Sequence, residues 1–159
     1  MAKVILVCGR ICCGKTTYAH RLAKGRRAAV LSVDEVMLAI FGKHCGDMHD
    51  TYAARTKQYL LAKAAELIAA DIDVILDWGP WTKSGRAELR EHFAARGIAF
   101  ELHAIEISDE VWRARLAQRN AAVEADEAQA YFVDENLAAK FASRYEAPEA
   151  DEVDVWITE

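Results

Sequence analysis

Short apolar runs alternate with segments that mix apolar and charged positions along this chain. Five of the runs fit buried parallel strands, because each is short and rich in apolar residues. They lie at residues 4–7, 28–33, 72–77, 98–107 and 153–157. Helix-compatible segments lie between them, at residues 17–23, 36–41, 51–71, 86–96, 111–120 and 133–145. This alternation predicts an α/β fold with a parallel five-stranded sheet flanked by helices.

Residues 121–130 depart from this pattern, since they are acidic and alanine-rich and show little periodicity. Such a stretch suits a mobile loop. With the neighbouring helix ends it predicts a small helical lid at residues 113–133. No internal repeat or linker interrupts the chain, so we expect one domain over residues 1–159.

The first expected strand leads into GRICCGKTT, which fits the spacing G-x-x-x-x-G-K-[ST]. Glycines let such a loop curl so that backbone N–H groups point at a polyphosphate, and the start of the next helix adds donors. In this motif Lys15 places a cation at the β- and γ-phosphates, and the hydroxyl of Thr16 is a ligand for Mg²⁺. The pattern resembles the P-loop NTPase superfamily, which implies a nucleoside triphosphate, most often ATP, with Mg²⁺. The predicted nucleotide-binding residues are Gly9, Arg10, Ile11, Cys12, Cys13, Gly14, Lys15, Thr16 and Thr17.

Two acidic residues come at the carboxyl ends of expected strands, where open α/β sheets bind ligands. Asp34 follows the run at 28–33, and Asp77 closes the run at 72–77. Apolar residues followed by Asp resemble a Walker B strand, which implies that Asp77 holds Mg²⁺ directly or through water. Structural alternatives exist for both: Asp34 suits a helix N-cap near Ser32, and Asp77 could cap a turn.

Bulky and cationic residues near these acids are candidates for substrate contacts. Trp78 and Trp81 flank a Gly-Pro turn, and they either wall a substrate or cover the end of the sheet. Arg86 opens the next helix, and its head could reach the transferred or receiving group. Arg115 and Arg119 are i, i+4 neighbours on one helix face, so they form either a solvated face or a lid cation for the transferring phosphoryl group.

Composition narrows the range of partners and compartments. Hydrophobic residues make up 53% and charged residues 28%, which is ordinary for a soluble protein. No apolar run approaches the roughly 20 residues that span a bilayer, and the opening residues lack the layout of a signal peptide. We therefore expect a cytoplasmic protein without a membrane partner. A net charge of −5 disfavours a long binding surface for nucleic acid.

Three cysteines, Cys8, Cys12 and Cys13, lie in or beside the phosphate loop. A disulfide there would distort the loop that has to curl around the phosphates. Reduced thiols in a cytosolic protein are therefore the better interpretation.

Five segments carry a further resemblance that covers nearly the whole chain. They read GRICCGKTT, SVDEV, VILDWGPWTKSGR, WRARLAQRN and FASRYEAPEADE. Their order resembles the small P-loop kinases of the polynucleotide kinase, zeta-toxin and chloramphenicol phosphotransferase type. The pattern D-W-G-x-W-[TS]-x-x-x-R with a closing E-x-P is similar to a bacterial subgroup described only as ATP-binding and kinase-like.

This resemblance implies a three-layer P-loop NTPase fold and transfer of the γ-phosphoryl group of ATP to a hydroxyl. By that carry-over, Lys15 and Thr16 hold phosphates and metal. Asp34 is the base that accepts the proton of the hydroxyl. Arg115 or Arg119 is the lid cation.

The acceptor is not implied, because these families differ in it. We expect a small molecule such as a metabolite, a nucleoside-like compound or an antibiotic, with Arg86 helping to position it beside Trp78 and Trp81. A 5′-hydroxyl nucleic acid is an alternative, since bases stack on tryptophan. A nucleotide-dependent switch or ATP-binding module is a third interpretation.

Overall fold

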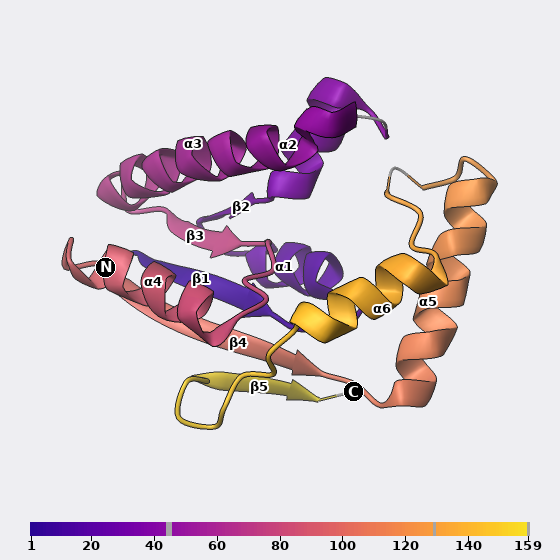
Figure 1. Ribbon diagram of the computed structural model, residues 1–159. Helices are drawn as coiled ribbons and strands as arrows, with labels where there is room; N and C mark the ends of the chain where they lie inside the picture. The colour runs from indigo at the N-terminus through magenta and orange to yellow at the C-terminus, as the bar shows by residue number, and fades with distance from the viewer. Residues whose placement is uncertain (44–45, 129, 159) are drawn as a thin grey trace.

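A computed structural model of the protein describes residues 1–43, 46–128 and 130–158 (Figure 1). The strands are β1 (Lys3–Cys8), β2 (Ala28–Leu31), β3 (Asp73–Leu76), β4 (Ala99–Glu106) and β5 (Val155–Thr158). The α-helices are α1 (Lys15–Ala23), α2 (Val33–Phe41), α3 (His49–Ala69), α4 (Lys83–Ala94), α5 (Asp109–Glu124) and α6 (Glu135–Arg144). A 3₁₀ turn, η1 (Gly46–Met48), precedes α3.

All strand pairs in the sheet are parallel, and the strand order is β2-β3-β1-β4-β5. Leu6 of β1 lies beside Leu76 of β3 and Leu102 of β4, so the carboxyl ends of these central strands meet at one edge. This confirms the predicted parallel five-stranded sheet with flanking helices. The helices α5 and α6 gather beyond the carboxyl ends of the strands, as Figure 1 shows.

Side chains of β1 alternate between two apolar cores, because successive residues of a strand point to opposite faces. Leu6 and its even-numbered neighbours pack with helices that include α4, whose Phe93 is fully buried. Ile5 and Val7 pack on the other face against Ala19 of α1. The sheet therefore forms the middle of three layers, with its binding edge left to the loops.

Two helices begin earlier than the periodicity predicts, because a side chain caps each of them. Ser32 accepts a hydrogen bond from the backbone N–H of Glu35 (3.3 Å), so α2 starts at Val33 rather than at residue 36. Thr82 accepts from the N–H of Gly85 (3.1 Å), so α4 starts at Lys83 rather than at residue 86. The N-cap of α2 is thus Ser32, and the alternative that Asp34 caps this helix is wrong.

The region predicted as a lid, residues 113–133, comprises most of α5 and the loop that joins it to α6. Ser108 caps α5, which extends to Glu124, four residues beyond the predicted end at 120. Asp134 caps α6 by accepting a hydrogen bond from Leu137 N–H (2.7 Å), so the helix starts at residue 135 rather than at residue 133. The loop between the helices is tied back to α5, since the side chain of Asn120 exchanges two hydrogen bonds with the backbone of Val133 (2.7 and 3.0 Å).

Within the described part of the chain, no helix combines the length and apolar composition needed to cross a bilayer.

Candidate functional site

The loop between β1 and α1 curls tightly, as the glycine spacing predicts. Gly9 has φ 155° and Gly14 has φ 102°, both in the range that side chains rarely adopt. A Cβ at Gly9 would lie 2.5 Å from the Sγ of Cys13 and 3.0 Å from the carbonyl oxygen of Ile105. Any larger residue at Gly9 would therefore force the loop away from β4.

Lys15 is folded back over its own loop. Its Nζ donates hydrogen bonds to the carbonyl oxygens of Gly9 (3.0 Å) and Arg10 (2.9 Å). These bonds hold the ammonium group beside the curled backbone while leaving it on the wall of a cavity. Phosphate oxygens are stronger partners for an ammonium group than neutral carbonyls are, so a bound polyphosphate would replace them.

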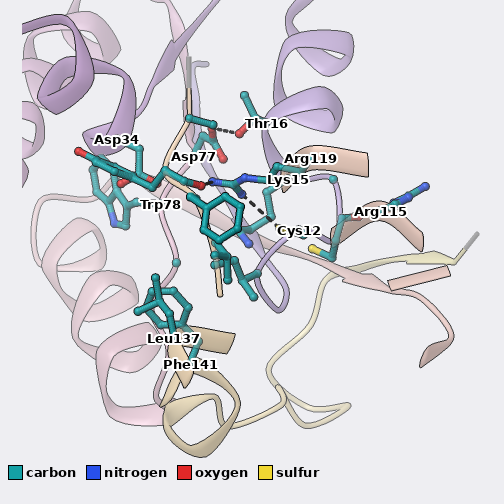
Figure 2. A pocket seen from close by; sticks show the side chains of 18 of the residues that line it. Cys12, Lys15, Thr16, Asp34, Asp77, Trp78, Arg115, Arg119, Leu137 and Phe141 are labelled. Carbon is teal, nitrogen blue, oxygen red and sulfur yellow. Dashed lines mark hydrogen bonds between the residues drawn. The ribbon is translucent and has the colours of Figure 1, made fainter. Parts of the chain in front are cut away.

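A cavity of about 1440 Å³ opens at the carboxyl edge of the sheet, and Figure 2 shows part of it. It exceeds the roughly 300–1,000 Å³ of a pocket for one small ligand. The predicted site residues that line it are Ile11, Cys12, Cys13, Gly14, Lys15, Thr16, Thr17, Asp34, Asp77, Trp78, Trp81, Arg115 and Arg119. The space can therefore hold two ligands, with the phosphate loop among its walls.

Thr16 and Asp77 meet at the base of this cavity. The Oγ1 of Thr16 donates to Oδ2 of Asp77 over 2.7 Å, drawn as a dashed line in Figure 2. Asp77 follows β3, and its backbone N–H donates to the carbonyl of Leu31 at the end of β2 (2.9 Å). A hydroxyl and a carboxylate are ligand types that suit Mg²⁺, which takes few protein ligands when phosphates supply the others. The donor set fits that ion, and no group of three or more His, Cys, Asp or Glu among the described residues forms a competing metal site.

Asp34 lies in the first turn of α2 and lines the same cavity (Figure 2). Asp34 is exposed to the solvent of the cavity, but protein atoms lie close around its carboxylate. The desolvation that these atoms cause raises the pKa of Asp34, and the negative charge of Asp77 raises it further. The positive charges of Arg119 and Lys15 act in the opposite direction. Because Ser32 provides the cap, the carboxylate of Asp34 is not occupied at the helix end and can accept a proton from a ligand.

Arg115 and Arg119 of α5 both reach the phosphate loop, rather than forming a solvated face. Arg115 Nη1 donates to the carbonyl of Cys13 (2.7 Å). Arg119 donates through Nη1 to the Sγ of Cys12 (3.3 Å) and through Nη2 to the carbonyl of Tyr131 in the lid loop (3.3 Å). The Nε of Arg119 is buried without a hydrogen-bond partner among the described residues. Arg119 itself lines the cavity, so a shift of its side chain would bring that donor to a bound phosphate.

The two tryptophans both line the cavity, but in different settings. Trp78 is 8% exposed, and its indole N–H has no hydrogen-bond partner in the described part of the chain. Trp81 stacks on Phe141 of α6, with ring centroids 4.9 Å apart and planes 7° apart. Trp81 also meets the edge of Tyr145 at 6.5 Å. Trp81 therefore packs against α6 while forming part of the cavity wall.

Arg86 does not reach the cavity, and the expected substrate contact needs correction. Its side chain is 2% exposed and forms a bidentate ion pair with Glu152, with Nε–Oε2 at 2.8 Å and Nη2–Oε1 at 3.0 Å. Its Nη1 donates to the carbonyl of Glu146 (2.7 Å). Arg86 therefore holds the segment after α6 against α4.

The side chain of Arg10 also points away from the expected nucleotide site. Its Nη1 pairs with Oδ1 of Asp109 (2.8 Å), and its guanidinium lies 4.8 Å from the ring centroid of Trp112. Trp112 in turn donates its indole N–H to the carbonyl of Ile11 (2.8 Å). Arg10 and Gly9 contact Lys15 through their backbone carbonyls. These two residues therefore shape the loop, and neither of them lines the cavity.

Several cavity residues were absent from the predicted site. Lys43 precedes η1 and forms an ion pair with Asp126 in the lid (2.7 Å). His49 at the start of α3 meets the ring of Tyr131 edge-on, with centroids 5.7 Å apart. These contacts join the segment after α2 to the lid across the mouth of the cavity. On α6 the additional lining residues are Leu137, Lys140, Phe141 and Arg144.

Comparison with known proteins places this arrangement in a family. A search of curated proteins finds no match to the sequence. Among solved structures, a proposed kinase from Chloroflexus aurantiacus is similar over 99% of this chain and 84% of its own, with 20% identity and a TM-score of 0.72. A gluconokinase from Sinorhizobium meliloti shares 18% identity over 98% and 82% of the two chains, with a TM-score of 0.62.

The APS kinase of Mycobacterium tuberculosis, solved with AMPPNP and APS, shares 21% identity over 99% of this chain and 88% of its own (TM-score 0.62). These likenesses show a fold shared with P-loop kinases. A profile of the family described as "AAA domain" matches residues 4–148, which is most of the chain. This protein therefore belongs to the AAA domain family and has the kinase-like form of the P-loop fold.

Proposed function

We propose that this protein transfers the γ-phosphoryl group of ATP to a hydroxyl group of a small molecule. One observation carries the proposal: a single cavity brings together the phosphate loop, the Thr16–Asp77 pair, two lid arginines and the carboxylate of Asp34. The similar structures include a gluconokinase and an APS kinase, which is consistent with this reaction class.

The phosphate end of the cavity supplies positive charge. Lys15 would exchange the carbonyls of its loop for phosphate oxygens, and the unpartnered Nε of Arg119 would donate to the same group. Thr16 and Asp77 would hold Mg²⁺, which neutralises phosphate charge when it is bound. These groups stabilise charge on the phosphoryl group as it moves, which is the larger part of catalysis in phosphoryl transfer.

The acceptor end supplies the base. As the acceptor oxygen bonds to the γ-phosphorus, the bond to the leaving oxygen of ADP breaks and the hydroxyl proton passes to Asp34. A carboxylate with a raised pKa is a better base than an ordinary aspartate, because its proton affinity is closer to what neutral pH requires. The lid would keep water from taking the phosphoryl group instead.

The acceptor is proposed to be small because the cavity holds it beside the nucleotide and because the chain is acidic, with net charge −5. A polynucleotide acceptor would need a basic track, and its binding would weaken steeply with salt. A nucleotide switch would need no base at all.

The test is Mg²⁺-dependent ATP consumption with nucleosides, sugars, aminoglycosides, chloramphenicol-like antibiotics and a 5′-hydroxyl oligonucleotide as acceptors. Asp34→Asn is expected to abolish transfer while leaving the ATP dissociation constant nearly unchanged. Glu35→Gln is the matched control, since Glu35 is an exposed neighbour that does not line the cavity. ATP binding without acceptor-dependent turnover, or full activity in Asp34→Asn, would overturn the proposal.

A further inference from the structure

Helix α6 presents two cations to the cavity. Lys140 and Arg144 are spaced i, i+4 and are therefore neighbours on one side of the helix, and they line the cavity together with Phe141. The helix is fixed in this orientation by the stack of Phe141 on Trp81. Figure 2 shows Phe141 and Leu137 of α6 projecting into the site that also holds Asp34 and Trp78.

These two cations differ from the others that line the cavity. Lys15 is bonded to its own loop, Arg115 and Arg119 to the loop and lid, and Lys43 to Asp126. Arg21 lies over the ring of Tyr18. The side chains of Lys140 and Arg144 form no hydrogen bond, ion pair or ring contact with any residue in the described ranges.

The sequence of α6 offers them no partner either. The positions one turn away from Lys140 hold Asn136, Leu137, Ser143 and Arg144. Lys140 and Arg144 are therefore like charges at i, i+4, a spacing that destabilises a helix. The helix dipole favours Arg144 in the last turn but gives Lys140, one turn earlier, little compensation. A bound anion would relieve this repulsion.

The acids that line the cavity do not supply that anion. Asp77 is bonded to Thr16, and Asp50 contacts His49. Asp34 lies on α2 and serves the acceptor hydroxyl, while Glu124 ends α5 at the lid. An acceptor lying between α2 and α6 would place its hydroxyl at Asp34 and its other end at the two cations.

We propose that Lys140 and Arg144 bind an anionic group of the acceptor, so that the substrate is a small organic anion with a free hydroxyl. A carboxylate and a phosphate monoester share the required chemistry, and a guanidinium beside an ammonium group suits either. Phe141, which lines the cavity with them, supplies apolar surface for the body of the substrate. This inference rests on the proposed function and extends it to the class of substrate.

The experiment compares acceptor pairs that differ only in the anion. D-gluconate is paired with D-glucose, and adenosine 3′-monophosphate with adenosine, with ATP and Mg²⁺ present. The wild type is compared with the double variant Lys140→Gln/Arg144→Gln, and with Arg113→Gln as control. Arg113 is an exposed arginine of the lid helix α5 that lines no part of the cavity, so its replacement changes charge without touching the site. Far-ultraviolet circular dichroism and the thermal midpoint verify that the double variant is folded.

We expect the wild type to prefer the charged member of at least one pair by about tenfold or more in kcat/KM. A preference of this size corresponds to the free energy of a hydrogen bond to a charged group. The double variant should reduce that ratio to near one, and Arg113→Gln should retain it. Equal use of neutral members, or a preference that survives in the double variant, would overturn the inference. Preferred turnover of a 5′-hydroxyl oligonucleotide over every small compound would also overturn it.

A second measurement separates this inference from the proposed function. With the nucleotide site filled by AMPPNP, calorimetry measures the binding of gluconate and of adenosine 3′-monophosphate. Binding that the double variant loses supports the anion site even if no acceptor is turned over, in which case only the kinase proposal fails. Turnover of neutral acceptors without such binding supports the kinase and overturns the anion site.

Discussion

Thr16 and Asp77 are 61 positions apart in the sequence, yet Thr16 Oγ1 donates a hydrogen bond to Asp77 Oδ2 over 2.7 Å. The pairing follows from the sheet, because β3 lies directly beside β1 with Leu6 opposite Leu76. The loop leaving β1 and the acid following β3 therefore arrive at the same place. The hydroxyl and the carboxylate of two separate sequence motifs form one oxygen-rich site.

Replacing Asp77 should weaken nucleotide binding only when Mg²⁺ is present. Asp77→Asn keeps an oxygen that can accept from Thr16 but removes the negative charge that favours a cation. We expect the ATP dissociation constant measured with Mg²⁺ to rise about tenfold or more, as for loss of a charged partner. With EDTA present, the variant and the wild type should bind ATP alike.

Asp71→Asn is the control for that measurement, because Asp71 is an exposed acid just before β3, at its opposite end from Asp77. Its φ of 57° is tolerated by asparagine, so the backbone should not be strained. An equal loss of affinity in EDTA, or a loss in Asp71→Asn as large as in Asp77→Asn, would contradict the assignment of the metal site.

Replacing Arg119 should weaken binding of a mimic of the transferring phosphoryl group more than it weakens binding of the nucleotide itself. Its Nε is buried without a partner among the described residues, and the residue lines the cavity that the phosphate loop also lines. We expect Arg119→Gln to weaken binding of ADP with aluminium fluoride, which mimics the transferring group, by about a hundredfold, as for loss of one such donor. The dissociation constant of ADP alone should change much less. If both constants changed equally, Arg119 would be a ground-state phosphate ligand and not a transition-state one.

Local spacing was enough to predict the fold and the phosphate loop. The apolar run at 4–7, the fixed glycines and the polar residues after each strand are properties of neighbouring positions. Helix starts at Val33 and Lys83 were missed because single hydroxyl groups, Ser32 and Thr82, decide them. Apolar periodicity does not register a cap that comes before the first apolar position.

Contacts between distant segments account for the errors in the site. Arg86 looked like a substrate ligand because it follows the Trp78–Trp81 turn, but its partner Glu152 lies 66 residues later in the chain. Lys140 and Arg144 were missed because the face that α6 turns to the cavity depends on the stack of Phe141 against Trp81. Neither relationship is visible in the residues adjacent to these positions.

Replacing Arg86 should reduce stability. Arg86 is 2% exposed, and its removal leaves the half-buried carboxylate of Glu152 without its partner. We expect Arg86→Gln to lower the free energy of unfolding at neutral pH by about 3 kcal/mol, measured by urea denaturation. Lys83 lies on the same helix as Arg86 and forms an exposed ion pair with Glu149. Lys83→Gln breaks that pair and should have little measurable effect on the free energy of unfolding.

The pH dependence of that loss gives a second check. The hydrogen bond from Arg86 lowers the pKa of Glu152, so the pair stabilises the fold above the ordinary glutamate range and stops doing so as pH falls through the lowered value. The difference between Arg86→Gln and the wild type should therefore shrink in acid. A loss of stability that stays constant between neutral and acidic pH would mean that packing, and not the ion pair, holds this segment.

The titration of Asp34 tests the proposed base without requiring an acceptor. Desolvation by nearby protein atoms, and then the charge of Asp77, raise the pKa of Asp34, so its carboxyl should titrate above the ordinary aspartate range in the ligand-free protein. Carbon-detected NMR of the side-chain carboxyl measures the midpoint directly. Asp77→Asn removes a like charge and should lower the midpoint, whereas Arg119→Gln removes an opposite charge and should raise it.

The same shift predicts the acidic limb of kcat/KM once an acceptor is found. Asp34 accepts a proton only when it is ionised, so activity should fall as the pH drops through its raised pKa, at higher pH than an ordinary aspartate would give. The limb should coincide with the NMR midpoint of the free enzyme. The assignment would be contradicted by a midpoint at or below the ordinary range of aspartate. It would also be contradicted if Asp77→Asn raised the midpoint or Arg119→Gln lowered it, and the base would then lie elsewhere.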